Sequence, residues 1–376
     1  MDPSEMLADL RELVECESPS TDLAAVARSA DVVARVGTAR LGVAPERVVL
    51  DGCTHLRWRL GAGPSRVLVL GHHDTVWPVG TLSTHPFRVD GDVVRGPGCF
   101  DMLAGLVMAF HALAGLEPEG GVTLLVTGDE ELGSPTSRAL VEEEARAAEA
   151  ALVLEASADG ALKTERKGVS LYEVVLGGRA AHAGLEPEAG VNATLELAHQ
   201  ALAVAGLTDL AAGTTVTPTL ARAGTTTNTV PAAGSIAVDV RVRSLVEQRR
   251  VDAAMRGLRP VLAGATVDVL GGPNRPPLEG ASSAALLARA RAVAVRLGLP
   301  EPTAAAVGGA SDGNFTAGVG TPTLDGLGAA GGGAHADDEH VLADELPGRT
   351  ALLRGLVSDL LAEPTNLLPS TGAARP

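Results

Sequence analysis

The chain has 376 residues, of which 45% are hydrophobic, so it can bury a substantial core, and its length favours two domains over one. Lys and Arg number 30 against 46 Asp and Glu, which gives a formal net charge of −16. This acidic balance, together with only 2% aromatic residues, argues against a nucleic-acid partner, which needs basic surfaces and stacking platforms.

Membrane and export signals are also missing from the sequence. No apolar run approaches the roughly 20 residues that a membrane span needs, and the acidic N-terminal segment lacks the basic and apolar regions of a signal peptide. Cys16, Cys53 and Cys99 form no C-x-x-C pair and are expected to be free thiols. We therefore expect a cytoplasmic protein without a membrane partner.

In the first part of the chain, apolar strands alternate with helices. The predicted elements are a helix that begins at Pro3 after an Asp2 cap, a helix over 23–41, a strand over 67–70, a helix over 104–116, and strands over 122–126 and 151–154. This alternation is typical of a parallel sheet that is covered by helices on both faces.

The pattern changes after Gly168. The next elements are predicted as a strand over 171–176, a helix over 191–204, strands over 215–221 and 236–242, a helix over 245–258 and a strand over 267–270. This β-α-β-β-α-β order is that of a compact α+β unit of the ferredoxin-like type.

The first pattern resumes after a linker rich in Pro and Gly, which is predicted over 271–280. The remaining elements are a helix over 284–297, strands over 304–307 and 322–324, and a helix over 347–361, with a frayed tail after Pro364. We therefore expect an α/β domain made of residues 1–167 and 279–376, with a smaller α+β domain, residues 168–278, inserted into it.

Acidic and imidazole side chains follow the ends of three predicted strands. His72 and Asp74 follow the first, Glu130 and Glu131 the second, and Glu155 the third. Because ligands of open α/β sheets bind at the carboxyl ends of the strands, these side chains are expected to converge. Two further residues could join them, namely Asp101 and His335.

This set of residue types indicates a metal centre. Imidazoles combined with carboxylates suit zinc or a similar divalent ion. The excess of carboxylates suggests two metals, since one bridging carboxylate lets two cations lie about 3.5–4 Å apart.

Six segments run in order through nearly the whole chain and carry a family resemblance. They are residues 71–76, 96–101 and 129–134, Glu155, and residues 181–184 and 332–335. Together they resemble the zinc aminoacylase/carboxypeptidase family of dinuclear metallopeptidases, and within it the glutamate carboxypeptidase-like branch. The resemblance implies a metal domain with an inserted dimerisation, or lid, domain, and hence a homodimer.

The same resemblance implies which residues hold the metals. His72 and Glu155 would hold one ion, Glu131 and His335 the other, and Asp101 would bridge them. The ions would be zinc, with cobalt or manganese as alternatives. The peptide bond after Asp101 would be cis.

Catalytic roles are implied in the same way. Glu130 would be the general base, taking a proton from the attacking water and passing it to the leaving nitrogen. Asp74 would hydrogen-bond and orient the imidazole of His72. His73 is a rival ligand, although the H-x-D spacing favours His72. His182 matches a family histidine that would reach across the dimer and stabilise the oxyanion.

Asn228 and Arg275 match residues that bind the terminal region of the substrate. Arginine suits a free carboxylate because its fork donates two parallel hydrogen bonds. The alternative for Arg275 is a solvated loop arginine. One departure lies at Leu103, where the family often has Lys.

The sequence therefore indicates a dinuclear zinc hydrolase that cleaves an amide bond next to a free carboxylate in a small molecule or short peptide. It would be a carboxypeptidase, with C-terminal glutamate as a candidate leaving group, or an N-acyl-amino-acid amidohydrolase. The alternatives are a deacylase of the acetylornithine or succinyl-diaminopimelate type, a catalytically silent metal-binding scaffold, and a metal sensor or store. A silent scaffold would be expected to have lost Glu130 or a ligand, and all of these residues are present.

Overall fold

The computed structural model describes residues 2–116 and 121–362, which form two compact units. The first unit comprises the residues up to 165, residues 279–307 and the residues from 311 onward, and the second comprises residues 166–278 and 308–310. The tail that the sequence predicts to fray after Pro364 lies outside the described residues. None of the helices in the described ranges combines the length and apolarity that crossing a bilayer requires.

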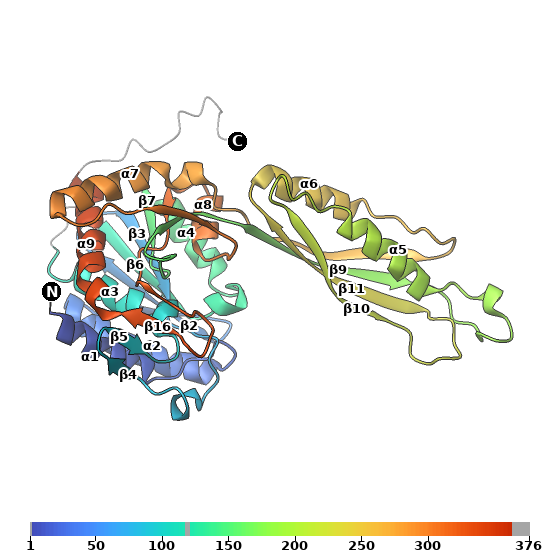
Figure 1. The fold of residues 1–376 in the computed structure, drawn as a ribbon, viewed down its shortest axis with the longest axis horizontal. Coiled ribbons are helices and arrows are strands. Elements are labelled where there is room, and N and C mark those ends of the chain that lie inside the picture. The colour runs from blue at the N-terminus through green and yellow to red at the C-terminus, as the bar shows by residue number, and fades with distance from the viewer. Residues whose placement is uncertain (1, 117–120, 363–376) are drawn as a thin grey trace. The chain divides into compact units, whose positions relative to one another are not determined.

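A six-stranded sheet forms the centre of the first unit (Figure 1). Strands β6, β3, β7 and β14 run parallel, whereas β1 and β2 form an antiparallel hairpin that joins the edge of β6. The expected parallel-rich sheet is confirmed, and the β1–β2 hairpin is an addition to it. In sheet order the strands are β1 (Glu46–Leu50), β2 (Cys53–Leu60), β6 (Gly121–Thr127), β3 (Ser65–His72), β7 (Ala150–Val153) and β14 (Thr323–Leu324).

Both faces of this sheet are buried, which explains why β3 is a continuous apolar run. Val67 and Val69 pack into one hydrophobic cluster, whereas Leu68 and Leu70 pack into another. Figure 1 shows helices on both sides of the sheet. The first cluster includes residues of α1 (Pro3–Val14), α2 (Leu23–Leu41), α3 (Ala104–Leu113), α7 (Gly280–Leu297) and α9 (Leu346–Ala362), and the second those of α4 (Arg138–Ala147) and α8 (Gly313–Gly318).

The helix starts that the sequence predicts are confirmed by their caps. The Asp2 carboxylate accepts a hydrogen bond from the Ser4 amide, and Pro3 occupies the first turn of α1. The Asp22 carboxylate accepts from the first amides of α2. These bonds satisfy backbone donors that have no partner within the helix.

A small sheet joins two segments that lie far apart in the sequence. Its strand order is β15-β16-β5-β4, so a hairpin from the region of residue 90 pairs with a hairpin from the region of residue 335. Periodicity did not predict this sheet, because its strands have only two or three residues each. These four strands are β4 (Arg88–Asp90), β5 (Val93–Arg95), β15 (Gly331–Gly332) and β16 (His340–Leu342). A separate two-stranded sheet is formed by β8 (Leu162–Arg166) and β13 (Ala304–Val307).

The second unit is an antiparallel four-stranded sheet with the order β10-β11-β9-β12 and two helices packed against it. This confirms the predicted ferredoxin-like fold, whose core includes Val174, Ile236 and Val251. In chain order the elements are β9 (Gly168–Gly177), α5 (Ala193–Ala205), β10 (Thr215–Ala223), β11 (Ala233–Val242), α6 (Leu245–Arg256) and β12 (Thr266–Arg275).

The predicted linker over 271–280 is wrong in its first half, because β12 continues to Arg275. Pro273 is tolerated there since β12 is an edge strand and its pairing with β9 is irregular between Pro273 and Arg275. Arg275 therefore lies at a strand end rather than in a loop.

Candidate metal centre

Three neighbouring parallel strands deliver acidic and imidazole side chains to one edge of the central sheet. Strand β3 ends at His72, β6 is followed by Glu130 and Glu131, and β7 is followed by Glu155. Because β6, β3 and β7 are adjacent and parallel, their carboxyl ends meet, as in other open α/β sheets.

The first group of possible ligands combines His72, Asp101 and Glu155. The His72 Nε2 atom lies 3.6 Å from Asp101 Oδ1 and 3.7 Å from Glu155 Oε1. The other ring nitrogen, Nδ1, lies 2.9 Å from the carbonyl oxygen of Asp74, so Nδ1 is the donor in that bond. In the neutral ring the Nε2 lone pair then faces two carboxylates, and this buried atom has no hydrogen-bond partner among residues 2–116 and 121–362. This set of nitrogen and oxygen donors fits a divalent cation.

The second group combines Asp101, Glu131 and His335. The His335 Nε2 atom lies 3.2 Å from Asp101 Oδ2 and 3.1 Å from Glu131 Oε1. Asp101 thus contributes one carboxylate oxygen to each group, which is the arrangement that a shared ligand of two metals requires.

The electrostatics of the two groups favour positive charge between the carboxylates. The carboxylates of Asp101 and Glu131 raise the pKa of His335 to about 10. Burial works to lower the pKa of His72, but the carboxylates of Asp101 and Asp74 outweigh it and raise that pKa well above its usual range. Burial likewise opposes ionisation of Asp101, but the imidazoles of His335 and His72 hold the pKa of this carboxyl far below its usual range. Such concentrated carboxylates need protons or metal ions between them.

The loops that carry Asp101 and His335 have unusual backbones. His335 adopts a left-handed conformation with φ of 62°, and the Asp101–Met102 peptide bond is cis, as the family resemblance implies. Gly331 lies so close to β16 that a Cβ atom would be 2.0 Å from the His340 carbonyl oxygen, so only glycine fits there. Leu103, at the position where the family often has Lys, is buried in the core of the first unit.

Asp74 connects the histidine to the turn that carries the two glutamates. Its fully buried carboxylate accepts hydrogen bonds from the amides of Glu130 and Glu131 at 3.2 Å each, and from Ser20 Oγ at 2.6 Å. Its Oδ1 atom is 3.4 Å from His72 Nδ1, so the imidazole is held mainly by the Asp74 carbonyl. Asp74 therefore positions both segments at once.

Glu130 is buried beside this network but belongs to neither group of possible ligands among the described residues. It begins the short 3-10 turn Glu130–Leu132, and its charge is near enough to help raise the pKa of His72. A carboxylate that lies next to possible metal ligands, without belonging to either group, has the chemistry of a proton acceptor.

His73, the rival ligand, is held by the protein. Its ring nitrogens lie 3.2 Å from Ser29 Oγ and 3.0 Å from the Thr54 carbonyl oxygen, and burial lowers its pKa to about 4. Both nitrogens are engaged in a neutral ring, which leaves none for a metal.

Sequence reasoning missed Asp129, which lies in a third buried group with Cys53 and His55. Its carboxylate accepts hydrogen bonds from the amide and hydroxyl of Thr136 and from the amide of Ser137. Asp129 thereby fixes the turn that follows β6, directly before Glu130. The signal in the sequence was its position two residues after a buried strand.

The remaining candidate residues belong to the second unit. His182 and Asn228 are on adjacent segments, since the Ala183 amide donates to the Asn228 carbonyl at 2.9 Å. Both side chains are exposed, and His182 Nδ1 accepts hydrogen bonds from two backbone amides. Arg275 is only 6% exposed, so the interpretation as a solvated loop arginine is wrong.

The model of peptidase family M20/M25/M40 matches residues 68–359. The chain belongs to this family. This M20 peptidase is 34% identical over 319 residues to carboxypeptidase G2 from Pseudomonas sp. (strain RS-16). The matched region covers 80% of this chain and 75% of the relative. The resemblance inferred from the sequence motifs is thus confirmed.

Solved structures share the fold of this M20 peptidase. A metallo-carboxypeptidase of the family from Sulfolobus solfataricus superposes with a TM-score of 0.72 and 17% identity, over 96% of this chain and 100% of that one. A dinuclear metal-binding peptidase of the family from Bacillus subtilis superposes with a TM-score of 0.64 and 15% identity, over 96% of this chain and 98% of that one. Family membership and the carboxypeptidase relative identify this M20 peptidase as a metal-dependent hydrolase of the carboxypeptidase and amidohydrolase class, which cleaves peptide or amide bonds.

Proposed function

We propose that this M20 peptidase binds two divalent ions, preferentially zinc, and removes an amino acid with a free carboxylate, such as glutamate, from a short peptide or an acylated amino acid. The observation that carries the proposal is the placement of Asp101, which offers one oxygen to each of two imidazole–carboxylate groups. The names of two similar proteins support it, since one is a carboxypeptidase and the other is described as dinuclear.

In this proposal the first unit is the metal domain. His72 and Glu155 would hold one ion, Glu131 and His335 would hold the other, and Asp101 would be a ligand shared by both. The buried Nε2 atom of His72, which has no hydrogen-bond partner in the described part of the chain, and the carboxylate oxygens near it suit zinc, with cobalt and manganese as substitutes.

The ions, when bound, polarise the scissile carbonyl and make a water molecule easier to deprotonate. Glu130 accepts the proton from the water that attacks the carbonyl and delivers it to the leaving nitrogen. Asp74 fixes the positions of the His72 ring and of the turn that begins at Glu130 through the hydrogen bonds described above. Asp74 thus holds the base through its carboxylate and the ligand His72 mainly through its carbonyl oxygen.

Arg275, assisted by Asn228, is the residue that we assign to the free carboxylate of the substrate. A buried carboxylate is costly unless it is paired, and arginine pairs with it through two hydrogen bonds. Arg275 is already withdrawn from bulk water, which strengthens such a pair.

This assignment and the proposed function are tested with one set of substrates. The parent enzyme is expected to cleave a glutamate-ended substrate much faster than the same substrate with its α-carboxylate amidated, whereas a plain N-acetyl deacylase would be expected to favour N-acetyl amino acids. Arg275→Ala should lower kcat/KM for the free carboxylate by about 100-fold, or about 3 kcal/mol, with metal content retained.

The matched control is Arg241→Ala, since Arg241 is a second-unit arginine that pairs with Asp239 on its own strand. It should change kcat/KM by less than about threefold. If Arg275→Ala still distinguishes the free from the amidated carboxylate as strongly as the parent does, another residue reads the carboxylate.

We also propose that residues 168–278 form the dimerisation domain of a homodimer. The edge strand β10 supports this, because most of its residues are exposed and could pair with a second copy. His182, which is exposed in this unit, would then serve the site of the partner subunit by stabilising the oxyanion.

Mixing two inactive variants tests the action of His182 between subunits. His182→Ala chains keep Glu130, and Glu130→Gln chains keep His182, so each mixed dimer has one complete site. After equimolar subunit exchange, about one quarter of the parent activity should return, because half of the dimers are mixed. Each variant alone is the control, and no recovery after exchange shown by mass spectrometry would mean that His182 does not act in the partner.

A cytoplasmic location remains part of the proposal. Cys16, Cys53 and Cys99 are free, which is usual for proteins of a reducing compartment. Burial raises the pKa of the Cys53 thiol to about 12, so this group is unreactive.

A further inference from the structure

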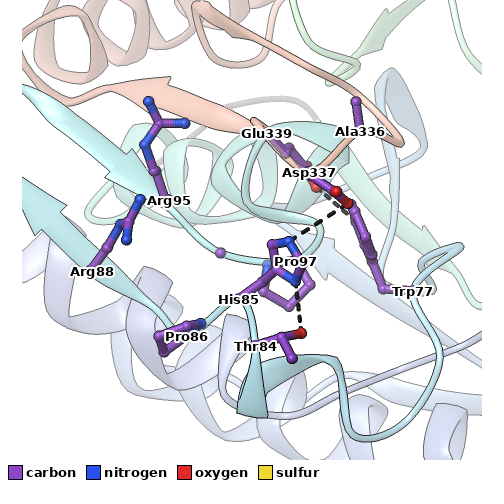
Figure 2. Close-up of a pocket in the computed structure, with 11 residues that line it drawn as sticks. Trp77, Thr84, His85, Pro86, Arg88, Arg95, Pro97, Ala336, Asp337 and Glu339 are labelled. Atoms are coloured by element: carbon purple, nitrogen blue, oxygen red, sulfur yellow. Dashed lines mark hydrogen bonds and ion pairs between the residues drawn. The ribbon is translucent and has the colours of Figure 1, made fainter.

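Glu339 is a buried carboxylate close to the candidate metal centre that no step of the proposed reaction uses. It is four residues after His335, between β15 and β16, and it is only 4% exposed. Figure 2 shows it beside Trp77 in the wall of a small pocket, and Trp77 Nε1 donates a hydrogen bond of 2.7 Å to Glu339 Oε2. Its isolation from water requires an explanation, since a buried carboxylate is costly unless it is fully bonded.

The other partners of Glu339 are backbone amides of the loop that carries Asp101. Oε2 accepts from the Gly98 amide at 2.9 Å, and Oε1 accepts from the amides of Phe100 and Asp101 at 2.9 and 3.0 Å. The remaining amide in this run, that of Cys99, bonds to the Gly96 carbonyl. Glu339 thus binds three of four consecutive amides through charge-assisted bonds, which are stronger than bonds between neutral groups.

The loop cannot provide these acceptors itself. Gly98 adopts a left-handed conformation with φ of 72°, and a Cβ atom there would lie 2.4 Å from Thr75 Cγ2. The backbone that follows departs from helical geometry at Asp101 and Met102. Amides in such an irregular turn lack regular backbone partners, and Glu339 replaces them.

Glu339 also connects the three segments that carry the proposed shared site. Trp77 is five residues after His72, Glu339 is four residues after His335, and the three amides belong to the loop of Asp101. A displacement of this carboxylate would therefore move Asp101 relative to both imidazoles.

We propose that Glu339 is a positioning residue that holds Asp101 where its two carboxylate oxygens face both metal sites. The proposal rests on the proposed dinuclear function. Glu339 touches neither substrate nor metal, and it acts through the Asp101 backbone. Outer residues that orient a metal ligand in this way are generally important for metal affinity.

The test is the metal affinity of Glu339→Gln, measured with zinc in competition with a chelator. The amide has the shape of the carboxylate but keeps only one acceptor oxygen, so its NH₂ group must face N–H donors. We expect the dissociation constants of both ions to rise by about 10- to 100-fold. The absorption bands of the cobalt-loaded protein should also change, because the geometry at Asp101 changes.

Trp77→Phe is the matched control, since it removes one hydrogen bond to Glu339 and leaves the three backbone bonds in place. It should alter the zinc dissociation constants by less than about threefold. If Trp77→Phe weakens zinc binding as much as Glu339→Gln does, Glu339 serves the Trp77 contact rather than Asp101, and the proposal is overturned.

A double-mutant cycle shows whether Glu339 acts through Asp101. In an Asp101→Ala background, Glu339→Gln should cause no further loss of zinc affinity, and an undiminished loss there would overturn the proposal. A purely structural role would lower the unfolding temperature of metal-free protein and leave the zinc affinity of folded protein unchanged, which would also overturn it.

Two further outcomes are decided by the same titrations. If Glu339→Gln does not fold, Glu339→Asp keeps the charge but shortens the reach, and it should show an intermediate loss of affinity; parent-like affinity would contradict the proposal. A parent that binds two zinc ions, with Glu339→Gln binding them equally well, overturns only the role of Glu339. A parent that binds fewer than two ions overturns the dinuclear function and this proposal with it.

Discussion

Glu130→Gln is expected to lower kcat by at least about 10²-fold while the protein keeps both metal ions. Glutamine preserves the size of the side chain but cannot accept the proton of the attacking water. The backbone amide of residue 130, which donates a hydrogen bond to Asp74, is unaffected by this substitution, so the turn should keep its position. Steady-state kinetics and metal analysis on the same preparation measure the two effects separately.

The neighbouring residue provides the matched comparison. Glu131→Ala removes the carboxylate that lies 3.1 Å from His335 Nε2, so this variant should lose metal as well as activity. If both variants lost metal to the same extent and had similar residual rates, the separate roles of base and ligand would be wrong.

Removal of the metals is the second prediction with a large effect. Purified protein should hold about two divalent ions per chain, since Asp101 joins two ligand groups. Exhaustive treatment with a chelator should abolish hydrolysis, and zinc, cobalt or manganese should restore it. Elemental mass spectrometry and activity on the same samples test this prediction.

Two variants check which group of residues binds the ions. His335→Ala should reduce the ion count, whereas Cys53→Ser should leave it at two. Cys53 belongs to a third group whose Asp129 carboxylate is already bonded to a turn of the chain. Full hydrolytic activity in metal-free protein would refute the metal-dependent reading of the site.

The core of the fold could be predicted from local patterns. Strands β3, β6 and β7 are short apolar runs because both faces of the sheet are covered, and their helical neighbours show periodic apolar positions. The alternating strands of the second unit also predicted its topology. Polar strands escaped prediction: β2 contains Arg57 and Arg59, and its pairing with β6 depends on residues more than 60 positions away.

The candidate site was predictable in part for a similar reason. Residues that directly follow buried strands must lie at the same sheet edge, so His72, Glu130 and Glu155 could be placed together from the sequence. Asp101 and His335 follow no strand of the central sheet. Their approach to each other depends on the small sheet that pairs β16 with β5, which local patterns do not reveal.

The sequence by itself determined the order of elements, the two-part α/β and α+β organisation, and the residue types of the candidate metal centre, because these depend on periodicity and on motifs of a few residues. Only the tertiary structure decided which carboxylates are buried and which groups they bond to. Glu339 belongs to the acidic run Asp337-Asp338-Glu339. Folding buries Glu339 against the backbone amides of the Asp101 loop, more than 230 residues away in the sequence. The burial of Arg275 also could not be predicted from the sequence. The partners of a buried charge are set by long-range packing, which no local pattern encodes.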